Sequence, residues 1–220
     1  MLSKRFAREL AASIADGMDV RLPLEDPVGE EVGETTHFSV MDRDGNTVAM
    51  TQSIELAYGS KAAAHGLGFL YNNYMLAFEL ENPAHPYYLR PNAVPWSSVA
   101  PTIVFRRKQP WLATGSPGSG RIFSAVTQFL VKVLDGSAPI NEATDEPRIH
   151  CSIGGKLSFE ADRVGADVVR YLEGLGYRLR PREPYAFYLG CVQTVLKCQS
   201  RPGFQGVADP RRDGTAAGPS

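Results

Sequence analysis

Hydrophobic residues follow a helical period in three parts of the chain. They recur three or four positions apart over residues 3–16, 122–134 and 164–175, and Gly176 ends the last of these segments. This spacing places the apolar side chains on one face of a helix. The pattern therefore predicts three amphipathic helices, the first of them short.

Shorter segments rich in β-branched and aromatic residues predict strands. Residues 37–41 and 47–53 form a hairpin around a polar turn, and the other candidates are residues 101–105, 110–114, 156–160 and 188–197. The strand at 110–114 runs directly into a glycine-rich turn that precedes the second predicted helix. Strand pairs with helices packed against them indicate a layered α+β domain.

Two connections stand out by composition. Residues 17–34 combine prolines and glycines with acidic residues, and residues 80–95 contain four prolines. The first is expected to be an exposed linker. The second is expected to be a long irregular loop of the kind that often serves function.

The 220 residues fit one domain with its own core. A net charge of −1 gives no basis for binding nucleic acid or an anionic membrane surface, and no apolar run reaches the ~18 residues of a membrane span. The histidines and cysteines lack the spacing of metal ligands, so we expect no metal and no cofactor. Cys151, Cys191 and Cys198 are expected to be free thiols, with a Cys191–Cys198 bridge as the alternative.

Two motifs carry the candidate chemistry. Residues 35–40 read Thr-Thr-His-Phe-Ser-Val, and residues 115–121 read Gly-Ser-Pro-Gly-Ser-Gly-Arg. Together they resemble the γ-glutamyltransferase family of N-terminal-nucleophile hydrolases. Residues 203–214 are similar to the C-terminal signature of the same family, so the resemblance covers essentially the whole chain.

The resemblance implies a precursor that cuts itself before Thr35. Residues 1–34 would be the end of a large subunit together with the cleavage linker, and residues 35–220 would be the small catalytic subunit. The implied fold is a four-layer αββα sandwich that the large subunit completes. The implied partners are this large subunit and a small-molecule γ-glutamyl or other acyl donor, and the N-terminus of the large subunit would decide between a cytoplasmic and a periplasmic or secreted location.

A threonine hydroxyl needs an adjacent base to act as a nucleophile. The free α-amino group of an N-terminal Thr35, with a pKa of about 7.7–8.0, can be that base. Ser53 occupies the position of a family threonine that supports the nucleophile, and a serine can make the same hydrogen bond. The alternatives are that Thr35 merely begins a strand and that Ser53 faces outward. His37 is expected to be structural, because the amine makes a histidine base unnecessary.

The glycine-rich turn resembles the oxyanion-binding turn of the family. Gly118 and Ser119 fall at the two positions whose backbone N–H groups would face the developing oxyanion. Ser119 replaces a glycine of the family, which is compatible with backbone donation if the dihedral angles permit. The alternative, a phosphate-binding loop, lacks the lysine that such a loop requires.

The predicted donor pocket both matches the family and departs from it. Ser97 and Ser98 match paired serines that hold the α-carboxylate of the donor, whereas Glu55, Tyr74 and Ala77 replace residues that contact the α-carboxylate and α-ammonium. A carboxylate thus stands where another should bind, and the ammonium loses its partner. Two like charges ~4 Å apart repel by about 4 kcal/mol at an effective dielectric constant of ~20.

The leading function is therefore amide cleavage or acyl transfer through an acyl-Thr35 intermediate. A second hypothesis keeps this nucleophile and changes the donor to poly-γ-glutamate, a glutaryl-type acyl group or a natural-product intermediate. A third is a truncated, non-catalytic chain that serves as a binding subunit. Cleavage of the Glu34–Thr35 bond would favour the first two.

Overall fold

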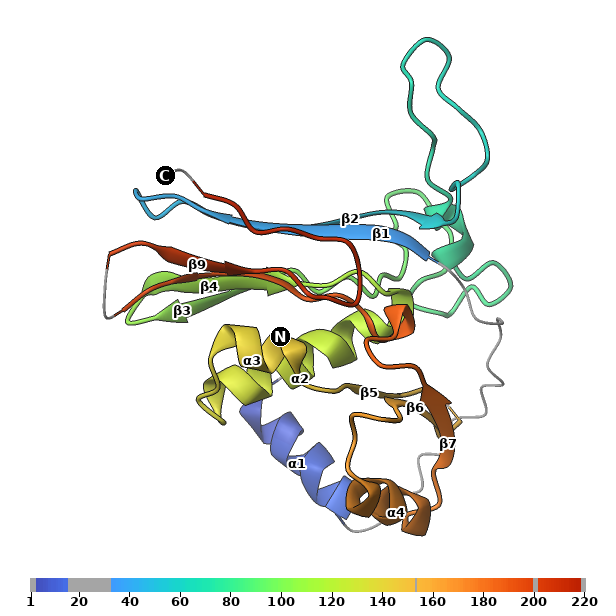
Figure 1. Ribbon diagram of the computed structural model, residues 1–220. Coiled ribbons are helices and arrows are strands. Elements are labelled where there is room, and N and C mark those ends of the chain that lie inside the picture. Colours follow the sequence, from blue (N-terminus) through green and yellow to red (C-terminus); the bar gives the residue numbers. More distant parts are fainter. Residues whose placement is uncertain (1–2, 16–32, 153, 200–201, 219–220) are drawn as a thin grey trace.

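The computed structural model describes residues 3–15, 33–152, 154–199 and 202–218, and they form stacked sheets with helices on one side (Figure 1). A two-stranded antiparallel sheet consists of β1 (Gly33–Met41) and β2 (Thr47–Leu56). It lies over a four-stranded antiparallel sheet in the order β3 (Thr102–Arg106), β4 (Gln109–Gly115), β8 (Gln193–Lys197) and β9 (Phe204–Val207). Helices α2 (Ile122–Leu134) and α3 (Ile140–Asp145) cover the other face of the larger sheet.

A smaller unit lies beyond these helices. It contains the three-stranded sheet β5 (Ile149–Cys151), β6 (Lys156–Glu160) and β7 (Arg178–Arg182), together with α4 (Ala166–Gly174). The other elements are α1 (Lys4–Ala15) and the 3₁₀ turns η1 (Tyr74–Ala77), η2 (Ser119–Arg121) and η3 (Phe187–Leu189). Among the described residues, none of the helices combines the length and the apolar character needed to cross a bilayer.

The two stacked sheets and the helices α2 and α3 account for three of the four layers in the expected sandwich. Side chains of β1 alternate between the two faces of the small sheet, so that His37 is buried against the larger sheet while Phe38 and Val40 point outward and are exposed. Leu112 of β4 and Phe129 of α2 belong to the buried core between sheet and helices. The described residues place no helix layer on the outer face of β1 and β2.

The three predicted helices are confirmed: α2 has the predicted ends, and the ends of α1 and α4 differ by one or two residues. The predicted strand at 188–197 is wrong in its first half, because η3 and Gly190, at φ 84°, precede β8. The periodicity also missed α3, β5, β7 and β9, all of six residues or fewer. The three cysteines are free, as predicted. Most of the predicted linker, residues 17–32, lies outside the described residues.

A buried ion cluster anchors the C-terminal segment to this core. Asp209 pairs with Arg148 at 2.5 Å and with Arg211 at 3.1 Å. Arg211 also pairs with Glu160 at 2.5 Å, and all four side chains are almost fully buried. Asp209 Oδ2 also accepts a hydrogen bond from the backbone N–H of Val192 at 2.8 Å. The cluster thereby ties the chain after β9 to the segment that enters β8.

Candidate active site

Thr35 and Ser53 face each other across the β1–β2 ladder. The Thr35 hydroxyl donates to Ser53 Oγ at 2.9 Å. Ser53 in turn donates to the backbone carbonyl of Glu34 at 3.2 Å and accepts the N–H of Glu55 at 2.9 Å. A serine hydroxyl has one proton and two lone pairs, so these three contacts use its whole hydrogen-bonding capacity. The structure thus brings together the two hydroxyls that the sequence singled out.

The ladder is irregular at the predicted cleavage bond. Glu34 pairs with Glu55 and Thr35 with Ser53, which leaves Ile54 as an extra residue and creates a β-bulge. Glu55 has φ 73°, a left-handed conformation that is uncommon for a residue other than glycine, asparagine or aspartate. Bulges are common beside active sites, where they redirect side chains and backbone groups. Here the bulge lies beside the Glu34 carbonyl that Ser53 contacts.

The glycine-rich turn connects β4 to α2 and needs a glycine at position 118 for two reasons. Gly118 has φ 134° and packs so closely on Gly190 that an added Cβ would lie 3.2 Å from the Gly190 Cα. Ser119 has φ 52°, a left-handed conformation that costs an L-residue about 1–2 kcal/mol. The turn therefore accepts a serine at 119 at an energetic cost, whereas Gly118 meets both a conformational and a steric limit.

His37 links β1 to this turn. Its ring packs on Gly115, where an added Cβ would lie 2.3 Å from His37 Cε1. The ring nitrogens contact Thr51 Oγ1 at 2.8 Å and Ser39 Oγ at 2.9 Å, and burial lowers the pKa of His37 to about 4. This neutral, buried histidine supports the structural role expected for it.

The predicted donor residues belong to segments that backbone hydrogen bonds hold together. Asn73, directly before η1, receives the N–H of Leu56 on its side-chain oxygen at 3.1 Å and donates its own N–H to Ile54 at 3.2 Å. At the other end of η1, the Ala77 carbonyl accepts the N–H of Trp96 at 3.4 Å. These contacts hold η1 and the segment around Trp96 next to the end of β2. The predicted donor residues lie in or beside these segments: Glu55, Tyr74, Ala77, Ser97 and Ser98.

Two residues that support the turn were missed by the sequence reasoning. The buried Ser116 hydroxyl donates to the Pro117 carbonyl at 2.6 Å and accepts the N–H of Cys191 at 2.8 Å. Gly190 packs on the turn with its own positive φ, and an added Cβ there would lie 2.9 Å from Ser116 Oγ. The only sequence signal was the Gly-Cys-Val step at 190–192 within an otherwise strand-like run.

Two stacked sheets, with Thr35 paired to Ser53 near the start of β1, are the arrangement expected for the class of N-terminal-nucleophile hydrolases. A model of the family "Gamma-glutamyltranspeptidase" matches residues 1–219. The chain belongs to the γ-glutamyltranspeptidase family.

Individual relatives agree with this assignment. The chain is 34% identical over 195 residues to a glutathione hydrolase proenzyme of Bacillus subtilis, covering 89% of this chain and 32% of the relative. An acylase ACY 1 proenzyme of Pseudomonas sp. (strain SE83) is 33% identical over 151 residues, covering 69% and 26%. A solved T380A mutant of Helicobacter pylori γ-glutamyltranspeptidase superposes with a TM-score of 0.70 at 35% identity, covering 80% of this chain and 100% of that one. The chain spans about a third of the length of the curated relatives.

Proposed function

We propose that this chain carries the nucleophile of a γ-glutamyltransferase-type amidohydrolase and acyltransferase, with Thr35 forming the acyl intermediate after cleavage of the Glu34–Thr35 bond. The observation that carries the proposal is the contact series from Thr35 Oγ1 to Ser53 Oγ and on to the Glu34 carbonyl. It joins a nucleophilic hydroxyl, its supporting hydroxyl and the carbonyl of the scissile bond.

In the cleavage step, Thr35 Oγ attacks the carbonyl carbon of Glu34 and loses its proton. The Ser53 hydroxyl donates to the carbonyl oxygen, where negative charge develops. The C–N bond then breaks, the proton passes to the leaving Thr35 nitrogen, and an ester joins Glu34 to Thr35 Oγ. Water hydrolyses this ester and leaves Thr35 with a free α-amino group.

In turnover, the α-amino group accepts the Thr35 hydroxyl proton as Oγ attacks the amide of the donor. The backbone N–H groups of Gly118 and Ser119 are proposed to stabilise the oxyanion. The leaving amine takes the proton, and water or an acceptor amine then releases the acyl group from Thr35. An attacking acceptor gives transfer, whereas water gives hydrolysis.

The remainder of the precursor is the proposed partner of this chain. The outer face of the β1–β2 sheet carries four large apolar side chains that are 40–51% exposed: Phe38, Val40, Val48 and Met50. The matched curated relatives are about three times longer and are proenzymes. We assign this face to the large subunit, because a contiguous apolar sheet face is stable only when another layer covers it.

The donor is proposed to be bound differently from an ordinary γ-glutamyl group. Ser97 and Ser98 are retained for an α-carboxylate, while Glu55 adds an anion and Ala77 lacks one. These differences oppose a free α-amino acid end group in its usual orientation. The Pseudomonas relative is named an acylase, yet it is about as similar in sequence to this chain as the glutathione hydrolase of Bacillus subtilis is. This supports variation of the donor on this scaffold.

Processing tests the nucleophile directly. The complete precursor should yield a fragment that comprises residues 35–220, and intact-mass spectrometry of the purified protein measures it. The Glu34–Thr35 peptide bond is the expected site because it is the bond that the Ser53 hydroxyl contacts. An active, fully processed protein cut at another bond would contradict the assignment of Thr35.

The donor proposal predicts a gain of function. Glu55→Asn combined with Ala77→Asp should raise kcat/KM for a γ-glutamyl anilide by at least about tenfold, since tenfold requires only 1.4 kcal/mol. Asparagine also suits the left-handed conformation at position 55. Hydrolysis of a simple acyl anilide is the control and should change less. A wild-type protein that already hydrolyses the γ-glutamyl anilide efficiently, with no gain in the double variant, would refute the altered donor pocket.

A further inference from the structure

The glycine-rich turn holds its two proposed oxyanion donors in an uncommon backbone conformation. Gly118 and Ser119 both have positive φ, 134° and 52°. A conformation of this kind persists only where the surrounding structure fixes it. The residues that fix this turn therefore determine the direction of the two backbone N–H groups.

The 3₁₀ turn η3 packs against the glycine-rich turn and is itself firmly anchored. Ala186 and Leu189, which flank its exposed part, are 0% and 2% exposed. Directly after η3, Gly190 packs on Gly118 and on Ala125 of α2, so closely that an added Cβ would lie 3.0 Å from the Ala125 Cβ. η3 is thus a fixed support beside the turn.

Arg121, the last residue of the turn, joins it to η3 through one side chain. Its Nε donates to the Tyr188 carbonyl at 2.9 Å, and its Cζ lies 4.2 Å from the centre of the Tyr188 ring. The backbone N–H of Arg121 donates to the Gly118 carbonyl at 3.0 Å, which closes the turn around Ser119. A movement of Arg121 away from Tyr188 would therefore move the segment that contains both proposed donors.

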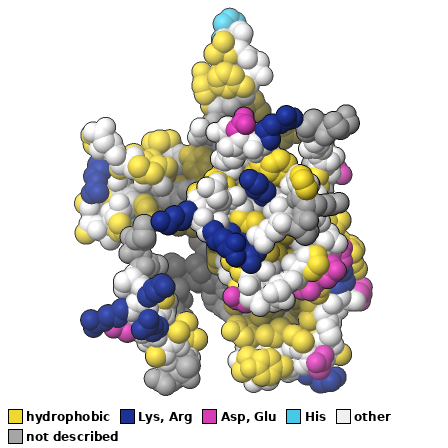
Figure 2. Space-filling view, turned by 90° about the vertical axis from the view of Figure 1, so that its left-hand side faces the viewer, with side chains coloured by type: hydrophobic (Ala, Val, Ile, Leu, Met, Phe, Trp, Pro, Cys, Tyr) yellow, Lys and Arg dark blue, Asp and Glu magenta, His cyan; other side chains and the backbone are white. Residues whose placement is uncertain are grey.

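A second arginine, from the smaller unit, holds the same tyrosine ring. Arg182 ends β7, and its Cζ lies 4.0 Å from the centre of the Tyr188 ring. An aromatic ring attracts a guanidinium group, more strongly where water is excluded. Many lysine and arginine side chains project into solvent, as on the face shown in Figure 2, whereas Arg121, Arg182 and Tyr188 are all partly buried.

We propose that Arg121, Tyr188 and Arg182 are positioning residues for the oxyanion site. Their contacts run from the smaller unit through the Tyr188 ring to the turn, and they hold the N–H groups of Gly118 and Ser119 in the direction that the reaction requires. This inference rests on the proposed function, because only an oxyanion at the turn makes that direction matter. It also gives the smaller unit a role, which is to support the turn from outside the stacked sheets.

The test is hydrolysis of a simple acyl anilide by the complete, processed protein. Tyr188→Leu removes the ring that both guanidinium groups contact, and should lower kcat at least about tenfold, since a shift of about 1 Å in a catalytic group can cost about 10² in rate. KM should change by less than about twofold, because formation and hydrolysis of the acyl-enzyme both pass through an oxyanion and the turn acts mainly on that state. Tyr188→Phe keeps the ring and should restore kcat to within about twofold of the wild type.

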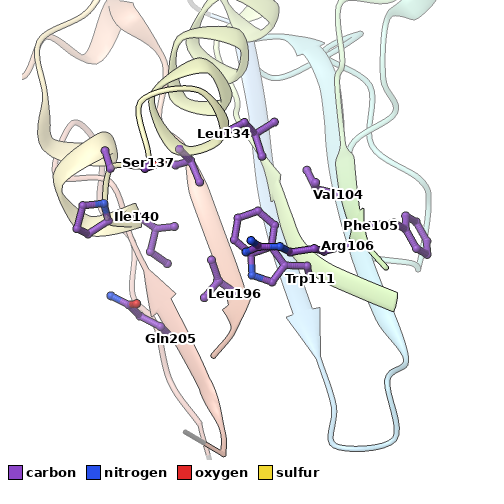
Figure 3. Close-up of a pocket in the computed structure, with 12 residues that line it drawn as sticks. Val104, Phe105, Arg106, Trp111, Leu134, Ser137, Ile140, Leu196 and Gln205 are labelled. Atoms are coloured by element: carbon purple, nitrogen blue, oxygen red, sulfur yellow. The ribbon is translucent and has the colours of Figure 1, made fainter. Parts of the chain in front are cut away.

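Two arginine variants test the contacts without removing the ring. Arg121→Lys keeps the charge but lacks the planar group that stacks and donates from Nε, and should lower kcat about as much as Tyr188→Leu. Arg182→Gln should lower kcat severalfold, and it decides the question if Tyr188→Leu does not fold. Arg106→Gln is the matched control, because Arg106 also lies over an aromatic ring, 5.4 Å from the centre of Trp111, but next to the β3–β4 turn at the opposite end of β4 (Figure 3). It should leave kcat unchanged.

The outcomes separate this inference from the proposed function. Wild-type kcat in folded Tyr188→Leu or in Arg182→Gln would overturn the positioning role, and so would an equal loss of kcat in Arg106→Gln and Arg182→Gln. A loss in Tyr188→Phe as large as in Tyr188→Leu would overturn the role of the ring. In each of these cases an inactive Thr35→Ala leaves the proposed function standing, whereas an active Thr35→Ala overturns the proposed function itself.

Discussion

Replacing Thr35 by alanine should abolish both processing and turnover. Alanine keeps the strand but removes the hydroxyl that donates to Ser53 Oγ beside the predicted cleavage bond. Loss of a catalytic nucleophile lowers kcat by at least about 10⁴. The measurements are intact mass for the uncut precursor and hydrolysis of an anilide for turnover.

Two further variants distinguish the role of the Thr35 hydroxyl from that of the Ser53 hydroxyl. Thr35→Ser retains a hydroxyl and should still be processed, more slowly than the wild type. Ser53→Ala keeps the nucleophile but removes its supporting hydroxyl, and should lower turnover by about 10². Normal processing or wild-type activity in Thr35→Ala would place the nucleophile elsewhere in the chain.

Asp209→Ala should destabilise the fold by about 3–5 kcal/mol, the usual effect of removing one partner from a buried ion pair. Arg148 would lose the Asp209 carboxylate, and Arg211 would keep Glu160 and the carbonyls of Thr144 and Glu146. The loss would also free the N–H of Val192, close to the Gly190 contact that supports the glycine-rich turn. The free energy of unfolding in urea measures the effect.

The controls for Asp209 separate charge from hydrogen bonding. Asp209→Asn can retain an oxygen acceptor for the backbone N–H of Val192 while it removes the negative charge. Asp213→Ala removes an exposed carboxylate in the same segment and should change stability by no more than about 0.5 kcal/mol. Equal unfolding midpoints for Asp209→Ala and Asp213→Ala would show that the buried cluster does not stabilise the chain.

The pairing of Thr35 with Ser53 could be anticipated from the sequence because a hairpin is a local structure. The pairing of Met41 with Thr47 around a short turn places Thr35 opposite Ser53, each six residues from that innermost pair. Alternation along β1 then puts Thr35 and His37 on the same face. The long amphipathic helices were recognisable for the same reason, since their periodicity extends over several turns.

The short elements could not be predicted in the same way. α3, β5 and β9 contain three to six residues, too few for a period to be distinguished from chance. The break at Gly190 interrupts an apolar run that is continuous in sequence, because this glycine must pack on Gly118 some seventy residues earlier.

The sequence by itself determined the family, the hairpin that carries Thr35 and Ser53, and the glycines of the turn, because these depend on neighbouring residues and on local backbone geometry. Only the tertiary structure decided that His37 lies against Gly115 and that Gly190 packs on Gly118. It also assembled the buried cluster around Asp209 from segments as much as sixty residues apart. Such contacts depend on how sheets and helices stack, and no local pattern of residues encodes that stacking.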